Sequence, residues 1–155
     1  MKTIDLMATV TQTGVGRRLH ILGHSVTIKL QRKETEGHYY VMEVVTPPGV
    51  GIPPHVHEIE DEMIYVLEGE FMVMLGDKSF NVGPGSEIFF PRHIPHSFQN
   101  IGATIGKTLW TIVPGGNFED FFDELNDLPS GPPDMGKVIE IFANYGMQIL
   151  INPPA

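Results

Sequence analysis

The feature that most constrains the fold is a succession of short apolar and β-branched segments, each closed by glycine or proline, between residues 26 and 113. In the first of them, Val26, Ile28 and Leu30 alternate with polar residues, which is the pattern of a strand with one buried face. Turn signals that recur about every 8–12 residues predict an all-β barrel or sandwich. The expected strands are residues 26–30, 38–46, 62–68, 70–76, 78–82, 86–90, 97–101 and 104–113.

After Gly116 the apolar spacing changes from a strand pattern to a helix pattern. Apolar residues at i, i+3, i+4, i+7 and i+10 predict an amphipathic helix with Asn117 as its N-cap, and its acidic opposite face is expected to be solvated. A second helix is expected from about Pro133 to Tyr145, with Gly146 at the C′ position. The expected apolar faces are Phe118, Phe121, Phe122, Leu125 and Leu128 in the first helix, and Val138, Ile141, Phe142 and Tyr145 in the second.

Composition excludes several classes of protein. The 155 residues predict one domain, with a barrel core at about 24–114 and a helical segment at about 117–146. The absence of cysteine excludes disulfides, iron–sulfur clusters and thiol nucleophiles, so a transition metal would need imidazole and carboxylate ligands. The net charge of −9 argues against nucleic acid or an anionic membrane as a partner. Because neither a signal peptide nor a long apolar span is recognisable, we expect a cytoplasmic location.

Histidine and glutamate are spaced as they would be in a metal site. His55 and His57 lie two residues apart, so on an extended segment both imidazoles face the same side. Glu62 begins the next expected strand and His96 follows further along the chain. Three imidazoles and one carboxylate suit a divalent first-row metal and leave up to two positions for water, O₂ or substrate. No role is expected for His20, His24 and His38.

The glycines that flank this cluster complete a known signature. The stretch reads Gly49-x5-His55-x-His57-x4-Glu62-x6-Gly69, and on this motif the chain resembles the cupin superfamily. A second cupin signature is matched at four of five positions, in Gly85-x5-Pro91-x-His93-x2-His96-x3-Asn100. His93 stands where the family has glycine, and this departure puts the geometry of that turn in doubt because histidine tolerates a positive φ less well.

The resemblance implies a fold and a metal centre. The fold is a double-stranded β-helix of the jelly-roll type, here followed by two short C-terminal helices. The metal, which can be manganese, iron, nickel, copper or zinc, would be held by His55, His57, Glu62 and His96. Small bacterial cupins similar to quercetin 2,3-dioxygenase have an ending like residues 114–125. The family also implies a homodimer, in which the segment before Val26 could add a strand to a neighbouring chain.

On each strand, residues that lie two positions from an inward-facing ligand also face inward, and we expect them to line a substrate pocket. Its expected apolar lining suits a mostly apolar or aromatic ligand. The run of acidic residues before Glu62 is expected to be solvated, namely Glu58, Glu60 and Asp61. The candidate substrate-binding residues are Ile64, Val66, Ile88, Phe90, Phe98 and, at the rim, His93.

Three functions fit these residues. The first is a metal-dependent dioxygenase acting on a small hydroxylated aromatic, flavonol-like or enol substrate, with Glu62 as ligand and general base. The second is a metal-dependent isomerase, lyase or cyclase, which would turn over without oxygen. The third is a non-catalytic small-molecule-binding module, although such a module need not retain all four ligands.

Overall fold

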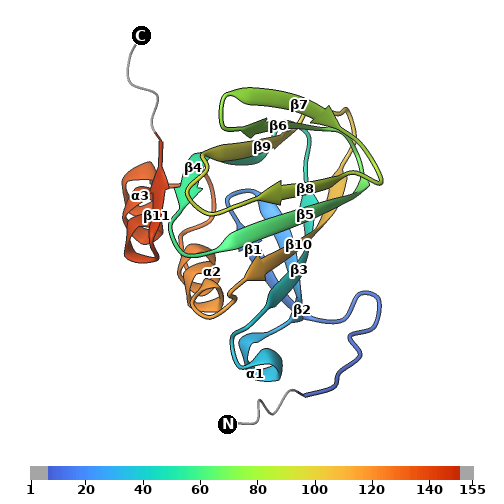
Figure 1. Cartoon of the computed structure of the whole chain (residues 1–155), viewed down its shortest axis with the longest axis vertical. Coiled ribbons are helices and arrows are strands. Elements are labelled where there is room, and N and C mark those ends of the chain that lie inside the picture. Colours follow the sequence, from blue (N-terminus) through green and yellow to red (C-terminus); the bar gives the residue numbers. More distant parts are fainter. Residues whose placement is uncertain (1–6, 151–155) are drawn as a thin grey trace.

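Two antiparallel sheets face each other in the computed structural model of the chain, which describes residues 7–150 (Figure 1). The six-stranded sheet has the order β1 (Arg17–Ile21), β2 (His24–Leu30), β3 (Tyr40–Thr46), β10 (Gly106–Val113), β5 (Asp61–Glu68) and β8 (Glu87–Phe90). The five-stranded sheet has the order β11 (Met147–Ile149), β4 (Gly51–His57), β9 (His96–Asn100), β6 (Phe71–Leu75) and β7 (Lys78–Val82). This is the double-stranded β-helix that the sequence predicted.

The core lies between the sheets because alternate residues of the central strands point inward. On β3 and β10 every second residue is buried, as the period of two requires. The register joins these residues into rows across the sheet. One row pairs Ile112 with both Tyr40 and Glu62, and pairs Glu62 in turn with Phe90. A metal-ligand candidate therefore stands in a row that is otherwise hydrophobic.

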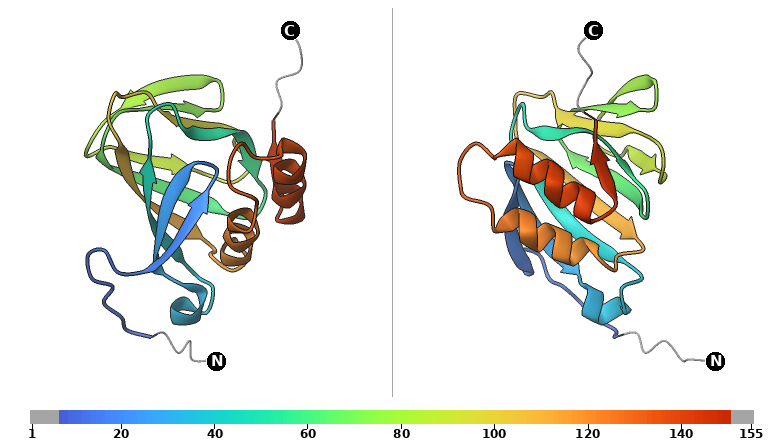
Figure 2. Two further views of the ribbon diagram at one scale, coloured as in Figure 1. Left: turned by 180° about the vertical axis from the view of Figure 1, so that it is seen from behind. Right: turned by 90° about the vertical axis from the view of Figure 1, so that its left-hand side faces the viewer.

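Two C-terminal helices lie across one end of the barrel, as the right-hand view of Figure 2 shows. The first is α2 (Phe118–Asn126), which buries Phe118, Phe121, Phe122 and Leu125 as its periodicity predicted. Asn117 precedes α2 but its side chain makes no capping hydrogen bond. The second is α3 (Met135–Asn144), which begins two residues later than expected because the side chain of Asp134 accepts from the amides of Gly136 and Lys137.

Four elements were not expected from the sequence: β1, β4, β11 and the short helix α1 (Arg32–Thr35). The strand β1 pairs with β2 of the same chain over residues 17–21, which belong to the segment that we expected to reach a neighbouring chain. The strand β11 pairs with β4 and places Met147 opposite His57. Both additions lengthen a sheet at its edge. Among residues 7–150, no helix has the length and apolar run needed to span a bilayer.

Candidate metal centre

Four buried side chains converge between the two sheets. His55 and His57 come from β4, His96 lies opposite His55 on β9, and Glu62 comes from β5 of the other sheet. One nitrogen or oxygen of each lies within 4.8 Å of those of the other three, and all four side chains are buried. The Nε2 atoms of His55 and His57 are 3.0 Å apart. The Oε2 atom of Glu62 is 3.3 Å from Nε2 of His96 and 3.7 Å from Nε2 of His57.

Backbone carbonyls fix the orientation of two of these rings. Nδ1 of His55 donates to the carbonyl oxygen of Pro53 at 2.8 Å, and Nδ1 of His96 donates to that of Ile94 at 3.0 Å. Because a carbonyl oxygen can only accept, the proton of each neutral ring must sit on Nδ1. Nε2 is then left with its lone pair directed to the centre, as a metal ligand requires.

The electrostatics of the group favour a cation. Burial, and then the neighbouring rings of His96 and His57, lower the pKa of His55 from 6.5 to about 3, so this imidazole is neutral at physiological pH. Its lone pair faces the Nε2 atom of His57 at 3.0 Å, an arrangement that a metal ion between the two nitrogens would stabilise. The donor set therefore fits a divalent transition metal.

Glu62 supplies the negative charge of the centre. Burial alone would raise the pKa of Glu62, but a hydrogen bond from His96 and the potential of all three histidines outweigh burial and hold that pKa below its usual range. That hydrogen bond requires a second proton on His96, at Nε2, and this proton occupies the position that a metal ion would take. Protons and metal therefore compete for this site, which makes metal binding weaker at low pH.

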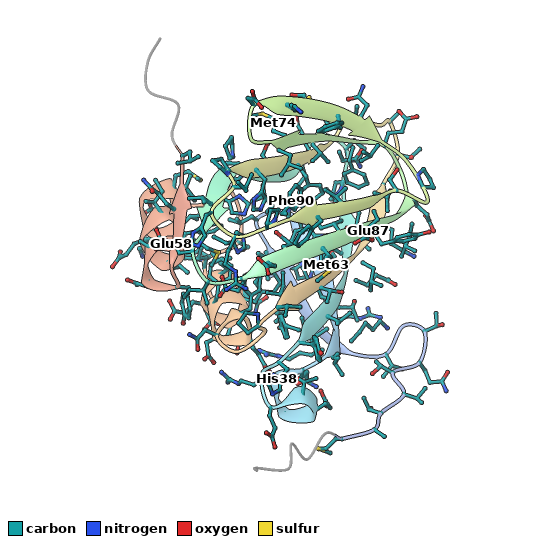
Figure 3. All side chains as sticks on the ribbon, in the orientation of Figure 1. His38, Glu58, Met63, Met74, Glu87 and Phe90 are labelled. Carbon is teal, nitrogen blue, oxygen red and sulfur yellow. The ribbon has the colours of Figure 1, made fainter. Side chains whose placement is uncertain are left out.

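The four side chains line a largely apolar cavity whose free volume is about 30 Å³. That volume has room for about two water molecules. Ile64, Phe90 and Phe98 lie in its wall, and Figure 3 shows Phe90 on β8 among the side chains packed between the sheets. Val66 and Ile88 are also buried but belong to the core outside this wall. Contact of any of these residues with a substrate stays a prediction.

His93 lies outside the cavity with an exposed side chain. Its φ of +69° shows that the turn keeps the left-handed conformation although glycine is replaced by histidine. The backbone amide of His93 donates to the carbonyl oxygen of His57 at 2.7 Å. The backbone at this position thus joins the loop before His96 to the strand that carries the other two histidines.

The sequence predicted Phe90 and Phe98 in the cavity wall but not the aromatic residues that the C-terminal helices add to it. Phe118 of α2 stacks on His57 with ring centroids 5.9 Å apart, and Phe142 of α3 meets His55 edge-on at 5.7 Å. Helix periodicity identified both residues as buried, but it does not indicate which surface they cover. The aromatic wall consists of Phe90, Phe98, Trp110, Phe118, Phe121, Phe122 and Phe142.

His24 also lines this cavity, although no role was expected for it. Its ring is 1% exposed, stacks on Phe98 at 5.7 Å and has Nδ1 3.0 Å from Oγ1 of Thr46. Strand alternation could have placed it inward, since Val26 and Ile28 follow on the same face of β2.

The acidic run before Glu62 divides into three environments. Glu58 is exposed, and Figure 3 shows it near α3 and β11. Asp61 accepts hydrogen bonds from the backbone amide, Nε and Nη2 of Arg92, and these bonds hold the pKa of Asp61 below its usual range. Glu60 is 2% exposed. The expectation that Glu60 is solvated was therefore wrong, because the loop between β4 and β5 turns it back toward His57.

Comparison with known proteins agrees with this geometry. Residues 42–112 match the cupin domain family. Quercetin 2,3-dioxygenase of Bacillus subtilis (strain 168) is 30% identical over 118 residues, which are 76% of this chain and 34% of that protein. The chain spans between 34% and 62% of the length of the curated relatives that it matches here.

Solved structures with the same fold include enzymes of different kinds. The polyketide cyclase RemF of Streptomyces resistomycificus is 28% identical, with a TM-score of 0.57 over 70% of this chain and 80% of that one. A predicted oxalate decarboxylase of Thermotoga maritima has a TM-score of 0.62 over 68% of this chain and 99% of that one, and its 23% identity supports the fold alone. Since the family match falls on the strands that carry all four converging side chains, the chain belongs to the cupin superfamily.

Proposed function

We propose that the chain is a metal-dependent dioxygenase for a small hydroxylated aromatic compound, such as a flavonol, or for an enol. One observation carries the proposal: a buried group of three histidines and one glutamate lines a cavity whose remaining wall is almost entirely aromatic and aliphatic. The similar protein of Bacillus subtilis is named quercetin 2,3-dioxygenase, which supports the same class of substrate.

The residues of the centre and of the cavity wall have separate roles in this reaction. His55, His57, His96 and Glu62 hold the metal, which when bound supplies Lewis-acid chemistry that lowers the pKa of a substrate hydroxyl. Glu62 accepts the hydroxyl proton, since its buried carboxylate lines the cavity in which that hydroxyl would bind. Phe90 and Phe98 hold the aromatic ring and exclude water from the reacting atoms.

A cyclase, isomerase or lyase is the second candidate. The same ligands would then polarise a carbonyl or stabilise an enolate without oxygen. The structural likeness to a protein named as a polyketide cyclase supports this alternative.

Oxygen dependence separates the two candidates. Metal-loaded protein is mixed with quercetin in air and under argon, while flavonol absorbance and dissolved oxygen are recorded together. The dioxygenase predicts loss of flavonol only in air, with one O₂ consumed per flavonol and both ¹⁸O atoms of labelled O₂ in the products. Turnover of the flavonol under argon would overturn the dioxygenase and favour the second candidate. An unchanged flavonol in air would contradict the flavonol substrate class.

The resemblance further supports a homodimer whose ligands are a small-molecule substrate and O₂. Sedimentation velocity of the full chain at micromolar concentration measures its assembly, and a monomer at every concentration would contradict this part of the proposal.

A further inference from the structure

A second carboxylate lies behind the metal centre. Glu60, in the loop between β4 and β5, is 2% exposed, and its Oε2 atom is 3.5 Å from Nδ1 of His57. Neither of these two atoms makes a hydrogen bond to any group in residues 7–150. A buried carboxylate oxygen that faces a single ring nitrogen is costly unless the two interact. This contact therefore needs an explanation.

His57 differs from the other two histidines at its outer nitrogen. Nδ1 of His55 and Nδ1 of His96 each donate to a neutral backbone carbonyl. The position that corresponds to those carbonyls is taken at His57 by the carboxylate of Glu60. The inner nitrogen of His57 faces the Nε2 atom of His55 and the carboxylate of Glu62. The ring of His57 therefore lies between two carboxylates, with Glu60 at its outer nitrogen and Glu62 at its inner nitrogen.

We propose that Glu60 is a positioning residue, which accepts the Nδ1 proton of His57 and makes this ring the strongest nitrogen donor to the metal. The proposal rests on the metal centre proposed above. A carboxylate bound to the outer nitrogen fixes the ring's tautomer and orientation, and it increases the electron density at the inner nitrogen. A neutral carbonyl does this to a smaller extent, so the three histidines are unequal ligands.

Charge balance supports the same role. A divalent ion held by three neutral imidazoles and Glu62 alone would leave one net positive charge in a buried site. Glu60 supplies the second negative charge without taking a coordination position. Buried charges are tolerated when they are paired in this way. Glu60 therefore stabilises the bound ion and, for a metal with two oxidation states, favours the higher one.

The test compares metal binding by wild type, Glu60→Gln and Asp61→Asn. Both substitutions replace one carboxylate by an amide of the same size at adjacent positions, but Asp61 binds Arg92 and not a ligand histidine. The affinity for Co²⁺ is measured by competition with a chelator. We expect Glu60→Gln to weaken binding by about 10- to 100-fold and to shift the visible Co²⁺ spectrum, as loss of a carboxylate behind a ligand histidine does elsewhere. Asp61→Asn should change neither, and Glu60→Asp should recover part of the affinity.

A second measurement uses only the wild type, so it does not depend on how well a variant binds metal. In the Zn²⁺-loaded wild type, ¹⁵N-histidine NMR should show a proton on Nδ1 of His57 far downfield of the Nδ1 protons of His55 and His96. Equal shifts for all three rings would overturn the proposal, as would wild-type affinity and an unchanged spectrum in Glu60→Gln. A wild type that binds no Co²⁺ would overturn the metal centre itself. Normal metal binding without oxygen consumption would overturn only the dioxygenase activity.

Discussion

The candidate metal centre is made of single side chains on different strands, with the carboxylate of Glu60 behind it in a loop. The ligand candidates could be predicted because a period of two places His55 and His57 on one face and the signature adds Glu62 and His96. The burial of Glu60 could not be predicted, because nothing in the spacing of a run of acidic residues distinguishes a buried carboxylate from a solvated one. His24 was missed for a different reason: alternation with Val26 and Ile28 places it inward, but no second histidine is spaced from it in a way that marks a site.

The general-base role of Glu62 is tested by Glu62→Gln. The amide oxygen can still contact the metal but is too weakly basic to accept the substrate's proton. We expect some metal to be retained and turnover to fall by about 10²- to 10⁴-fold. Steady-state rates and metal content are measured together, with Glu58→Gln as the exposed control from the same acidic run. Full activity in Glu62→Gln would remove the base role.

His24 makes the metal-free protein less stable in acid. Burial lowers the pKa of His24 from 6.5 to about 4. Between these values the unfolded chain binds a proton at this residue and the native chain does not. The free energy of unfolding therefore falls as the pH is lowered from about 6.5 toward 4, by up to about 1.4 kcal/mol per pH unit from this group.

Replacing this ring removes its share of the pH dependence. In His24→Gln, we expect the slope of unfolding free energy against pH in this range to be shallower than in wild type by roughly 1 kcal/mol per unit. Urea denaturation at pH 4.5, 5.5, 6.5 and 7.5 measures the slope. His20→Gln, at an exposed position of the same hairpin, should leave the slope unchanged. Identical slopes in wild type and His24→Gln would contradict the assignment.

At the scale of elements, the C-terminal helices decide access to the centre. Phe118 and Phe142 lie on two histidines of the centre, and the free space of about 30 Å³ beside them is far smaller than the roughly 300 Å³ of a typical ligand pocket. A substrate of flavonol size therefore requires these helices to move.

Phe142→Ala tests that role of α3. Its ring packs on His55 and on Phe121, so its removal leaves a cavity beside the centre. We expect the free energy of unfolding to fall by about 3–5 kcal/mol, measured by urea denaturation of the metal-loaded protein. The enlarged pocket should also bind an apolar fluorescent dye more tightly.

Met135→Ala is the matched control, because Met135 is on the same helix but 44% exposed. It should change the free energy of unfolding by less than about 0.5 kcal/mol. Equal effects of the two substitutions, or unchanged dye binding in Phe142→Ala, would show that α3 does not close the cavity.

Two of the unexpected strands, β1 and β4, were missed because each contains or precedes residues that usually argue against a strand or a hairpin there. The strand β4 contains Pro53 and Pro54, which indicate a break, and the structure accommodates them at a shift in register between Ile52 and His55. The hairpin of β1 and β2 turns at Leu22 and Gly23, which both have positive φ. Because asparagine usually precedes glycine in such turns, a leucine at that position conceals the hairpin.

At the scale of the whole molecule, the two sheets matter because neither carries the complete centre. Three histidines come from the five-stranded sheet and Glu62 from the six-stranded one, so the ligands meet only when the barrel closes. Helix α2 is held against the same barrel by two ion pairs, in which Arg32 of α1 binds Asp120 and Arg17 of β1 binds Asp123. Its acidic face is therefore partly paired rather than solvated throughout.

We expect this barrel to hold a transition metal at His55, His57, Glu62 and His96. Elemental analysis of protein purified without added metal or chelator tests it most directly. We predict about one manganese, iron, nickel, copper or zinc ion per chain in wild type and in His93→Ala, whose side chain lies outside the cavity, and little in a His55→Ala/His57→Ala double variant. A wild type without metal even after supplementation, or a double variant with undiminished metal, would contradict the account.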